Sequence, residues 1–540
     1  MRTTSRTWSW AETVGESATR AAVAQAVRTD GPFHIGVLLD NDPEFLFWLG
    51  GAALSGATVV GINSTRRGSV LAEEIRFVDC QMIITDTAGR ALLDGLDTGV
   101  PHERVLVIDG SDYAELVEAH RAGAADVLAA AGREETAADA LMLLLFTSGT
   151  TGASKAVKCS QRRLARLGYQ LGRKFDVGRD DVCYCCMPLF HGNALMSLWA
   201  PALAAGATVC LAPKFSASRF LDDVRLFGAT YFTYVGKALG YLMATPERPD
   251  DAGNTLTHGF GTEASPEDQD EFRRRFGAVL YEGYGSSEGS GTVRLDAGAP
   301  DGALGRPAHE GVVVVDADTE EAKARARLDR HGRVLNPDEA IGEIVDKRGA
   351  GQFEGYYKND VADAERLRHG WYWTGDLGYV DTDGFMYFAG RKGDWIRVDG
   401  ENTSALQIER ILRRHPQVVT AAVFAVPDPR SGDQVMAALE IEPHGRFAPA
   451  EFCDFLAAQE DLGTKATPRL LRVSHGLPTT GSNKVQKAVV QRQAWRCDDP
   501  IYRWAGRPPA VYALMTGEDI RRWEEEFARH GRIRFIPASA

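Results

Sequence analysis

Three stretches of the chain repeat one hydrophobic pattern: an apolar run with helical spacing, then a glycine, then a run rich in β-branched and aromatic residues. They are residues 55–60, 205–210 and 227–232, with Gly56, Gly206 and Gly228 at the break. Glycine adopts the left-handed conformation that ends many helices, so each stretch predicts a helix that stops at its glycine and a strand that follows. Repeated units of this kind predict an α/β fold, with parallel strands covered by helices and ligands bound at the carboxyl ends of the strands.

The pattern changes after about residue 300. Between residues 305 and 390, glycine-rich turns alternate with short strand-like runs such as residues 341–345 and 384–390. A new unit begins near residue 394, where Thr403 and Ser404 precede an apolar-periodic helix and residues 418–426 read as a strand. We therefore predict a second, α+β domain and place the boundary near Gly393.

Residues 45–62 are uncharged and apolar over just enough length to be considered as a membrane span. Several glycines interrupt this segment and its end is β-branched, so a helix, a glycine stop and a strand are the better interpretation. The N-terminal residues contain no apolar signal region. Neither a transmembrane helix nor a secretory signal is predicted.

Length, charge and cysteine content argue against several classes of function. At 540 residues the chain is too long for one hydrophobic core. Its net charge of −13 argues against a general nucleic-acid binder, because no basic excess is present to replace counterions. Eight cysteines show no paired spacing, and the group at residues 183–186 is expected to fill a core strand rather than bind a metal. These features favour a reducing cytoplasm.

The apolar run 141–146 breaks abruptly into hydroxylated residues, two glycines and Lys155. A buried strand followed by hydroxyls, exposed main-chain N–H groups and one ammonium predicts a site that holds a polyphosphate. The spacing is not that of a Walker P-loop, because Ser154 rather than glycine precedes the lysine. A polar surface turn after a core strand is the alternative.

Four further segments combine glycine with residues that can bind a nucleotide: residues 281–289, 371–376, 390–402 and 477–487. In this order and spacing, together with residues 147–155, they resemble the adenylate-forming superfamily of acyl-CoA synthetases, luciferases and nonribosomal adenylation domains. Gly393 stands where most of the superfamily has aspartate. With residues 399–402 and the long tail after Lys484, this resembles the branch of very-long-chain acyl-CoA synthetases and fatty-acid transport proteins, whose bacterial members activate fatty acids or steroid side-chain acids.

The resemblance implies a large domain, residues 1–392, of stacked αβα layers with a β-rich subdomain. It also implies a small, mobile α+β domain, residues 393–540, that carries the catalytic lysine loop and a C-terminal extension. In the superfamily the small domain rotates between the two half-reactions. Gly393 is expected to act as the hinge, because glycine tolerates the change in backbone angles that a hinge requires.

The resemblance places the ATP phosphates on the hydroxyl-rich loop, whose implied cofactor-binding residues are Thr147, Ser148, Gly149, Thr150, Thr151, Gly152 and Lys155. Tyr284, beside Gly285, would stack on adenine, and Glu288 would hold Mg²⁺ with help from Ser287. A core tyrosine is the alternative for Tyr284. A helix N-cap with a first-turn carboxylate is the alternative for the Ser287–Glu288 pair.

Asp376 would accept hydrogen bonds from the ribose hydroxyls, and Arg391 would reach the ribose or phosphate region. A turn aspartate and a surface salt bridge are their respective alternatives. Lys484 is the implied catalytic lysine, whose ammonium would bridge the substrate carboxylate and the α-phosphate. Lys487 is the alternative by register.

On the acyl side, the resemblance gives His191 a catalytic role at the entry of the carboxylate, with a satisfied core histidine as the alternative. Gly261 and Thr262 would pass beneath the nucleotide. Residues 234–237 would line the acyl channel.

The implied activity is that of an ATP- and Mg²⁺-dependent acyl-CoA synthetase. A fatty or steroid carboxylic acid would form acyl-AMP with release of pyrophosphate, and coenzyme A would then displace AMP. Loading of a carrier protein is the alternative within the superfamily. A catalytically silent binding protein is disfavoured, because Lys155, Glu288, Asp376, Arg391 and Lys484 are all retained.

The amphipathic stretch at residues 517–530 is expected to form a helix that docks on the protein body. Peripheral membrane contact through this stretch is the alternative, since the implied substrate is a lipid.

Overall fold

The computed structural model describes the chain except for residues 132–136, 149–153, 263, 265, 290–291, 295–297, 301, 331, 333, 392–394, 399–400, 431, 443–444, 460–461, 463–465, 482–483, 506–510 and 538–540. Two compact units are present. The first comprises Met1–Ala238, Thr245–Gly291 and Ala350–Glu365, and the second Leu239–Ala244, Thr292–Gly349 and Arg366–Ala540. The predicted boundary between residues 392 and 393 falls at residues outside the description and stays a prediction.

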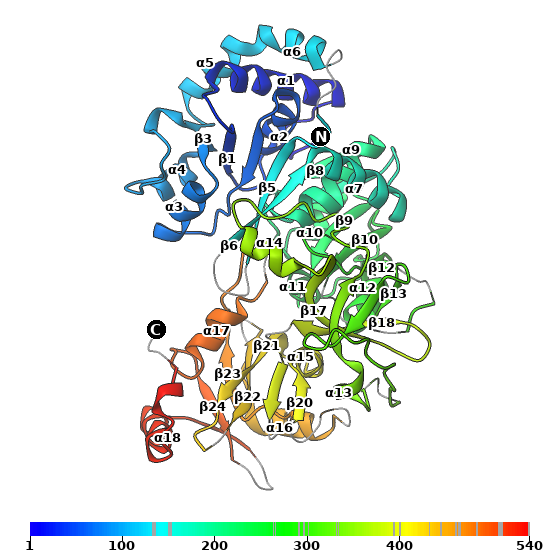
Figure 1. The fold of residues 1–540 in the computed structure, drawn as a ribbon, viewed down its shortest axis with the longest axis vertical. Helices are drawn as coiled ribbons and strands as arrows, with labels where there is room; N and C mark the ends of the chain where they lie inside the picture. Colours follow the sequence, from blue (N-terminus) through cyan, green and yellow to red (C-terminus); the bar gives the residue numbers. More distant parts are fainter. Residues whose placement is uncertain are drawn as a thin grey trace. The chain divides into compact units, whose positions relative to one another are not determined.

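A six-stranded sheet of order β4-β3-β1-β2-β5-β6 forms one layer of the first unit. Its strands are β1 (His34–Leu38), β2 (Thr58–Gly61), β3 (Cys80–Thr85), β4 (Val105–Val107), β5 (Leu141–Ser148) and β6 (Ser154–Ser160). All neighbours pair in parallel except β5 and β6, which form an antiparallel hairpin. Figure 1 shows α1 (Trp10–Val27), α2 (Pro43–Ser55), α5 (Ser111–His120) and α6 (Ala124–Ala131) as one group, and α3 (Gly68–Phe77) and α4 (Thr87–Leu93) apart from them.

A second, wholly parallel sheet of order β11-β10-β9-β7-β8 completes the first unit. Its strands are β7 (Val182–Cys185), β8 (Thr208–Leu211), β9 (Tyr231–Val235), β10 (His258–Thr262) and β11 (Val279–Glu282). The helices that alternate with them are α7 (Gln161–Lys174), α8 (Gly192–Ala194), α9 (Ala200–Ala205), α10 (Phe220–Phe227), α11 (Gly236–Met243) and α12 (Pro266–Phe276). The predicted parallel α/β fold is confirmed in both sheets.

The three predicted helix stops are confirmed. Gly56, Gly206 and Gly228 have φ angles of 69°, 72° and 65° and end α2, α9 and α10, and β2, β8 and β9 begin within three residues of them. The candidate membrane span is therefore a helix, a glycine and a strand, as predicted. Among the helices that the structure describes, none combines the length and the hydropathy needed to cross a bilayer.

The cysteine group lies in the core, as expected. Cys183 and Cys185 belong to β7, and all three cysteines of residues 183–186 are buried and free. Burial raises the pKa of their thiols, which keeps them protonated and unreactive at neutral pH.

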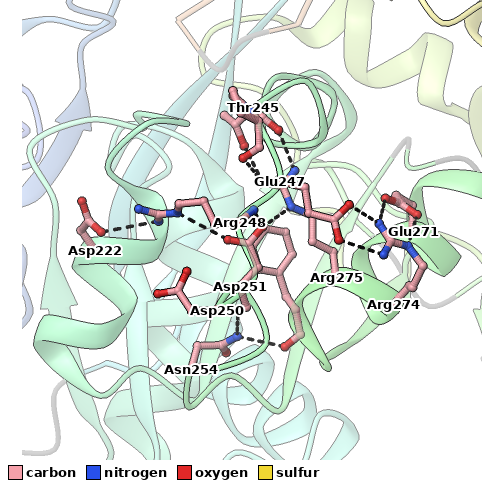
Figure 2. A network of polar contacts seen from close by, with 12 residues as sticks. Asp222, Thr245, Glu247, Arg248, Asp250, Asp251, Asn254, Glu271, Arg274 and Arg275 are labelled. Atoms are coloured by element: carbon pink, nitrogen blue, oxygen red, sulfur yellow. Dashed lines mark hydrogen bonds and ion pairs between the residues drawn. The ribbon is translucent and has the colours of Figure 1, made fainter.

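A buried ion pair ties the connection between α11 and β10 to helix α12 (Figure 2). Arg275 Nε donates to Asp251 Oδ2 over 2.5 Å, and its other nitrogens donate to the carbonyls of Thr245 and Pro246. Burial opposes ionisation of Asp251, but hydrogen bonds from Arg275 and the Arg248 main chain outweigh it and lower the pKa of the carboxyl. This pair holds the segment that leads into β10.

The second unit contains a β-rich part, as predicted for residues 305–390. Its antiparallel sheet has the order β12-β13-β18-β17-β15-β14, with β16 also paired to β17. The strands are β12 (Val293–Arg294), β13 (Ala303–Pro307), β14 (Val312–Val315), β15 (Gly342–Asp346), β16 (Leu367–Arg368), β17 (Trp371–Val380) and β18 (Met386–Arg391). Short helices α13 (Pro337–Ala340) and α14 (Asp360–Arg366) lie in the same stretch of sequence.

The C-terminal part of the second unit begins with the hairpin β19 (Trp395–Val398) and β20 (Glu401–Ser404). A five-stranded sheet follows, with β21 (Val418–Pro427), β22 (Asp433–Ile441), β23 (Leu470–Ser474), β24 (Ile501–Trp504) and β25 (Tyr512–Leu514) side by side in that order. Helices α15 (Ala405–Arg413) and α16 (Pro449–Ala457) pack on one face, and α17 (Lys487–Gln493) and α18 (Gly517–Arg529) on the other (Figure 1). Short helical turns lie at His102–Arg104, Arg121–Gly123, Leu195–Trp199 and Ile533–Phe535.

The C-terminal amphipathic helix docks on the protein body, as expected. Trp523 and Phe527 of α18 are buried in the same core as Phe424 and Met436 of the sheet. A capping box at Thr516 fixes the start of the helix. Its apolar face is therefore already covered by protein.

Candidate functional site

The predicted phosphate-binding segment is a β-hairpin. Its buried strand, β5, is confirmed, and β6 returns antiparallel to it with Lys155 opposite Thr147 and Ser154 opposite Ser148. The predicted residues Gly149, Thr150, Thr151 and Gly152 form the connection and lie outside the described residues, as does the side chain of Ser148. The hairpin register places the lysine and the first threonine on neighbouring strands.

Lys155 extends from β6 toward an aromatic ring and a carboxylate. Its Nζ lies 5.2 Å from the ring centroid of Tyr356 and 3.5 Å from Glu365 Oε2. The side chain is only 13% exposed. Such a largely enclosed ammonium attracts an anionic ligand more strongly than an exposed one, since water screens its charge less.

Glu288 is hydrogen-bonded to strand β5 and to Tyr356. The residue is 7% exposed, and its Oε1 accepts hydrogen bonds from Thr147 Oγ1 over 3.3 Å and from the Tyr356 hydroxyl over 3.1 Å. Tyr356 thus contacts Glu288 with its hydroxyl and Lys155 with its ring face. The structure thus brings together Thr147, Lys155 and Glu288, which are far apart in the sequence.

The oxygen donors at this place suit a magnesium ion. Mg²⁺ prefers oxygen ligands and is commonly held by one or two carboxylates together with substrate phosphates. Glu288 supplies the carboxylate, and the hydroxyl of Thr147 is hydrogen-bonded to it. Among the described residues there is no group of three or more His, Cys, Asp and Glu side chains that could hold a metal alone. Glu288 and the Thr147 hydroxyl are therefore oxygen groups of the kind that can take part in holding such an ion.

The carboxyl edge of the parallel sheet carries the predicted residues Gly261, Thr262, Tyr284 and Gly285. A Cβ atom at Gly261 would lie 2.4 Å from the Tyr234 ring, so this position requires glycine. The Tyr234 hydroxyl donates to Glu282 Oε1, which also accepts the main-chain N–H of Ala264. Tyr284 is half-buried and follows β11 by two residues. The Glu282 carboxylate thus ties the ends of β9, β10 and β11 together.

Tyr234, predicted for the acyl channel, is 2% exposed. Burial, and then the adjacent Glu282 carboxylate, raise the pKa of its hydroxyl. His191 immediately precedes α8, and its ring lies 4.6 Å from that of Phe190. A Cβ atom at the next residue, Gly192, would lie 3.2 Å from Ser287 Oγ. The structure therefore places the His191–Gly192 segment beside the Ser287–Glu288 segment.

In the second unit, Asp376 on β17 is paired in register with Arg391 on β18. Gly375 has φ 72° and donates its N–H to Glu343 Oε1 over 2.9 Å, and the N–H of Asp376 is held by Thr374 Oγ1. These contacts fix the backbone from which the aspartate side chain projects. The Arg391 side chain lies outside the described residues.

In the second unit, the residues on either side of the lysine loop are hydrogen-bonded to each other. Thr480 donates its N–H to the Lys484 carbonyl over 2.7 Å, and its Oγ1 accepts the Lys484 N–H over 3.1 Å. Lys484 is half-buried. Lys487, the alternative, begins α17 and forms an ion pair of 2.7 Å with Glu409, whose carboxylate also accepts the Val423 N–H. Lys487 thus fastens α17 to α15 and β21.

Two residues of this site were not singled out by the sequence. Tyr356 forms an isolated antiparallel bridge with Val157 of β6, and no sequence signal singled it out. Arg163 is buried on the inner side of α7 and donates to the carbonyls of Lys158 and Ser287. No sequence signal set it apart from the neighbouring Arg162, because burial of a charge depends on distant partners.

Comparison with known proteins places the chain among adenylate-forming enzymes. The family described as AMP-binding enzyme matches residues 2–357, and the one described as AMP-binding enzyme C-terminal domain matches residues 407–484. The chain is 68% identical to steroid-22-oyl-CoA synthetase of Rhodococcus jostii (strain RHA1), over 99% of this chain and 96% of the relative. It is 45% identical to the medium/long-chain-fatty-acid–CoA ligase FadD17 of Mycobacterium tuberculosis (strain ATCC 25618 / H37Rv), over 89% and 91% of the two chains.

A solved structure shares the fold. The crystal structure of the anthranilate CoA ligase AuaEII in complex with anthranoyl-AMP matches with a TM-score of 0.77 at 19% identity, over 92% of this chain and 93% of that one. The similarity covers both the layered αβα sheets with their β-rich part and the smaller C-terminal part.

Proposed function

The chain belongs to the AMP-binding enzyme family and is an AMP-forming acid–thiol ligase, and from this premise we propose that its substrate is a steroid side-chain carboxylic acid. The observation that carries the proposal is the 68% identity to a steroid-22-oyl-CoA synthetase over 99% of the chain. The 45% identity to a medium/long-chain-fatty-acid–CoA ligase makes such fatty acids the second substrate class.

The reaction has two steps. The substrate carboxylate attacks the α-phosphorus of ATP, forming a C–O–P anhydride and breaking the bond to pyrophosphate. The thiol of coenzyme A then attacks the acyl carbon, loses its proton and displaces AMP. When bound, Mg²⁺ would neutralise charge on the phosphate oxygens.

We assign the nucleotide to the residues described above. Thr147, Lys155 and the residues between them would hold the β- and γ-phosphates. Glu288 with Ser287 would hold Mg²⁺. Support comes from the hydrogen bond that joins Thr147 to Glu288 and from the partly enclosed ammonium of Lys155. Tyr284 and Gly285 would lie against adenine, with Gly261 and Thr262 beneath the nucleotide, and Asp376 and Arg391 would bind the ribose.

The substrate carboxylate would meet two further residues. Lys484 would neutralise the carboxylate and the α-phosphate as the anhydride forms. His191 would border the entry of the acid, which is supported by its place next to the Ser287–Glu288 segment. The fixed main chain of Lys484 supports its choice over Lys487, whose ammonium is already paired with Glu409.

A substrate panel tests the proposal. We expect acid-dependent ATP–pyrophosphate exchange and CoA-thioester formation. The value of kcat/KM for a steroid acid carboxylated at C22 should be at least about 10-fold above that for fatty acids of medium and long chain, because a rigid ring system loses less conformational freedom on binding than a flexible chain. Higher activity with fatty acids would overturn the steroid assignment. Exchange without CoA consumption would instead favour loading of a carrier protein.

We also propose a cytoplasmic enzyme that contacts membranes peripherally, since its substrate is a lipid. The covered face of α18 argues for another surface, and α7 exposes Tyr169 (61%) together with Arg166 and Arg173. Aromatic and basic side chains side by side suit an anionic bilayer surface. Co-sedimentation with vesicles of phosphatidylglycerol should exceed that with phosphatidylcholine and should fall in Tyr169→Ser. Equal sedimentation in all cases would exclude this surface.

A further inference from the structure

Helix α7 carries two adjacent arginines with opposite environments. Arg162 points outward: its side chain is 61% exposed and pairs with Asp139 over 2.7 Å. Arg163 is only 4% exposed, and among the residues that the structure describes no carboxylate forms an ion pair with it. A buried guanidinium without a counter-charge is costly, so it must be held by strong hydrogen bonds.

The hydrogen bonds of Arg163 join the two parts of the nucleotide site. Nη1 donates to the carbonyl of Lys158 over 2.8 Å, and Nη2 donates to the carbonyl of Ser287 over 2.6 Å. Lys158 lies on β6 three residues beyond Lys155, and Ser287 immediately precedes Glu288. The rigid, planar guanidinium of Arg163 therefore sets the distance between strand β6, which carries Lys155, and the segment that carries Glu288.

The first turn of α7 is also hydrogen-bonded to the segment that contains Tyr356. Ser160 caps the helix by accepting the Arg163 N–H over 3.1 Å. Its own N–H and hydroxyl donate to the two oxygens of Glu354, over 2.6 Å and 2.5 Å. Glu354 lies two residues before Tyr356, which contacts both Glu288 and Lys155. The start of α7 is thus connected to β6, to the Ser287–Glu288 segment and to the segment that holds Tyr356.

We propose that Arg163 is a positioning residue that sets the Glu288 carboxylate for a nucleotide-bound magnesium ion. The inference rests on the proposed function, since it takes Glu288 as the residue that holds Mg²⁺. Arg163 touches neither nucleotide nor metal, and it acts through the Ser287 carbonyl.

Three variants test the inference: Arg163→Met, which removes the guanidinium; Arg163→Lys, which keeps the charge; and Arg162→Met, a matched control on the same helix. Binding of a fluorescent ATP analogue is titrated with and without Mg²⁺, and thermal unfolding is recorded for each. We expect Arg163→Met to weaken Mg²⁺-dependent nucleotide binding about 10-fold or more, as removal of a supporting hydrogen bond around a metal ligand commonly does. Metal-free binding should change far less, and Arg162→Met should match wild type.

Arg163→Lys should recover part of the Mg²⁺ effect, since one ammonium can reach one of the two carbonyls. A lower unfolding temperature with unchanged Mg²⁺ dependence in Arg163→Met would overturn the inference and leave a purely structural role. If that variant does not fold, Arg163→Gln, which can still donate to one carbonyl, supplies the same titration. Failure of the proposed function is distinguishable, because wild-type protein would then show no Mg²⁺-dependent nucleotide binding.

Discussion

Tyr356 shows how one side chain can hold two charged groups of opposite sign. Its hydroxyl donates to Glu288, and its ring face lies beneath the ammonium of Lys155. Its own main-chain N–H is fixed by Asp363 over 2.7 Å, and the ring is fully buried. The carboxylate and the ammonium therefore keep their separation before any ligand binds, which limits the reorganisation needed on binding.

Tyr356→Phe should lower the rate of acid-dependent pyrophosphate exchange about 10-fold, because Glu288 loses a hydrogen bond to a charged group while the ring under Lys155 remains. Tyr357→Phe is the control, since its hydroxyl donates instead to Asp79 over 2.7 Å. Pyrophosphate-exchange assays on both variants test the role of the Tyr356 hydroxyl. Equal rates for the two would mean that the hydroxyl of Tyr356 does not matter for the site.

Substitution of Lys484 and of Lys487 should have different effects. Lys484→Ala should reduce adenylation roughly 10²–10³-fold, since a positioned charge that acts in the transition state is lost. Lys487→Ala breaks the pair with Glu409 and should lower the unfolding temperature while leaving exchange per folded molecule nearly unchanged. The reverse pattern would transfer the catalytic role to Lys487.

At the scale of elements, the hydrophobic pattern predicted what depends on neighbouring residues. Gly206 ends a helix because the left-handed conformation costs glycine little, and the apolar alternation of β21 separates Val423 and Phe424 onto two cores. The pattern could not show that β6 folds back on β5, because that pairing depends on a connection of only a few residues. Nor could it distinguish Arg163 from Arg162, since burial of a charge depends on distant partners.

The ion pair between Asp251 and Arg275 should contribute to stability in a pH-dependent way. Asp251→Asn leaves Arg275 buried without its counter-charge and should cost about 3 kcal/mol at pH 7. The folded-state pKa of Asp251 lies below its ordinary value of 3.8. The stabilisation is therefore complete above that value and disappears as the pH falls through the folded pKa.

Urea unfolding at pH 7, 5 and 3 should show a constant difference between wild type and Asp251→Asn at the first two values and a smaller one at pH 3. Asp250→Asn is the control, because Asp250 is exposed and its pair with Arg225 should be worth less than about 1 kcal/mol. A difference that persists unchanged at pH 3 would mean that packing rather than charge explains the effect.

At the scale of the whole molecule, the predicted site residues are divided between the two units. Thr147, Lys155 and Glu288 belong to the first, and Asp376 and Lys484 to the second. Each unit has its own sheets, and the C-terminal sheet of the second has a core on both faces. Neither unit alone carries the full set of proposed site residues.

Gly393 lies outside the described residues, so its role as a hinge remains a prediction from the sequence. Proline at this position would fix φ near −65° and remove the main-chain N–H, whereas alanine would keep both free. Gly393→Pro should therefore leave more of the adenylation rate than of the rate of thioester formation, because only the second step would follow the predicted domain rotation. Gly393→Ala should preserve both rates.

Separate assays of pyrophosphate exchange and acyl-CoA formation, each normalised to folded protein, measure the two steps. A rotation that is blocked after adenylation also predicts that enzyme-bound acyl-AMP accumulates in Gly393→Pro, which can be quantified after acid quenching. Equal losses in both assays, without accumulated acyl-AMP, would mean that the backbone at this position supports the fold of the junction rather than a change between two arrangements.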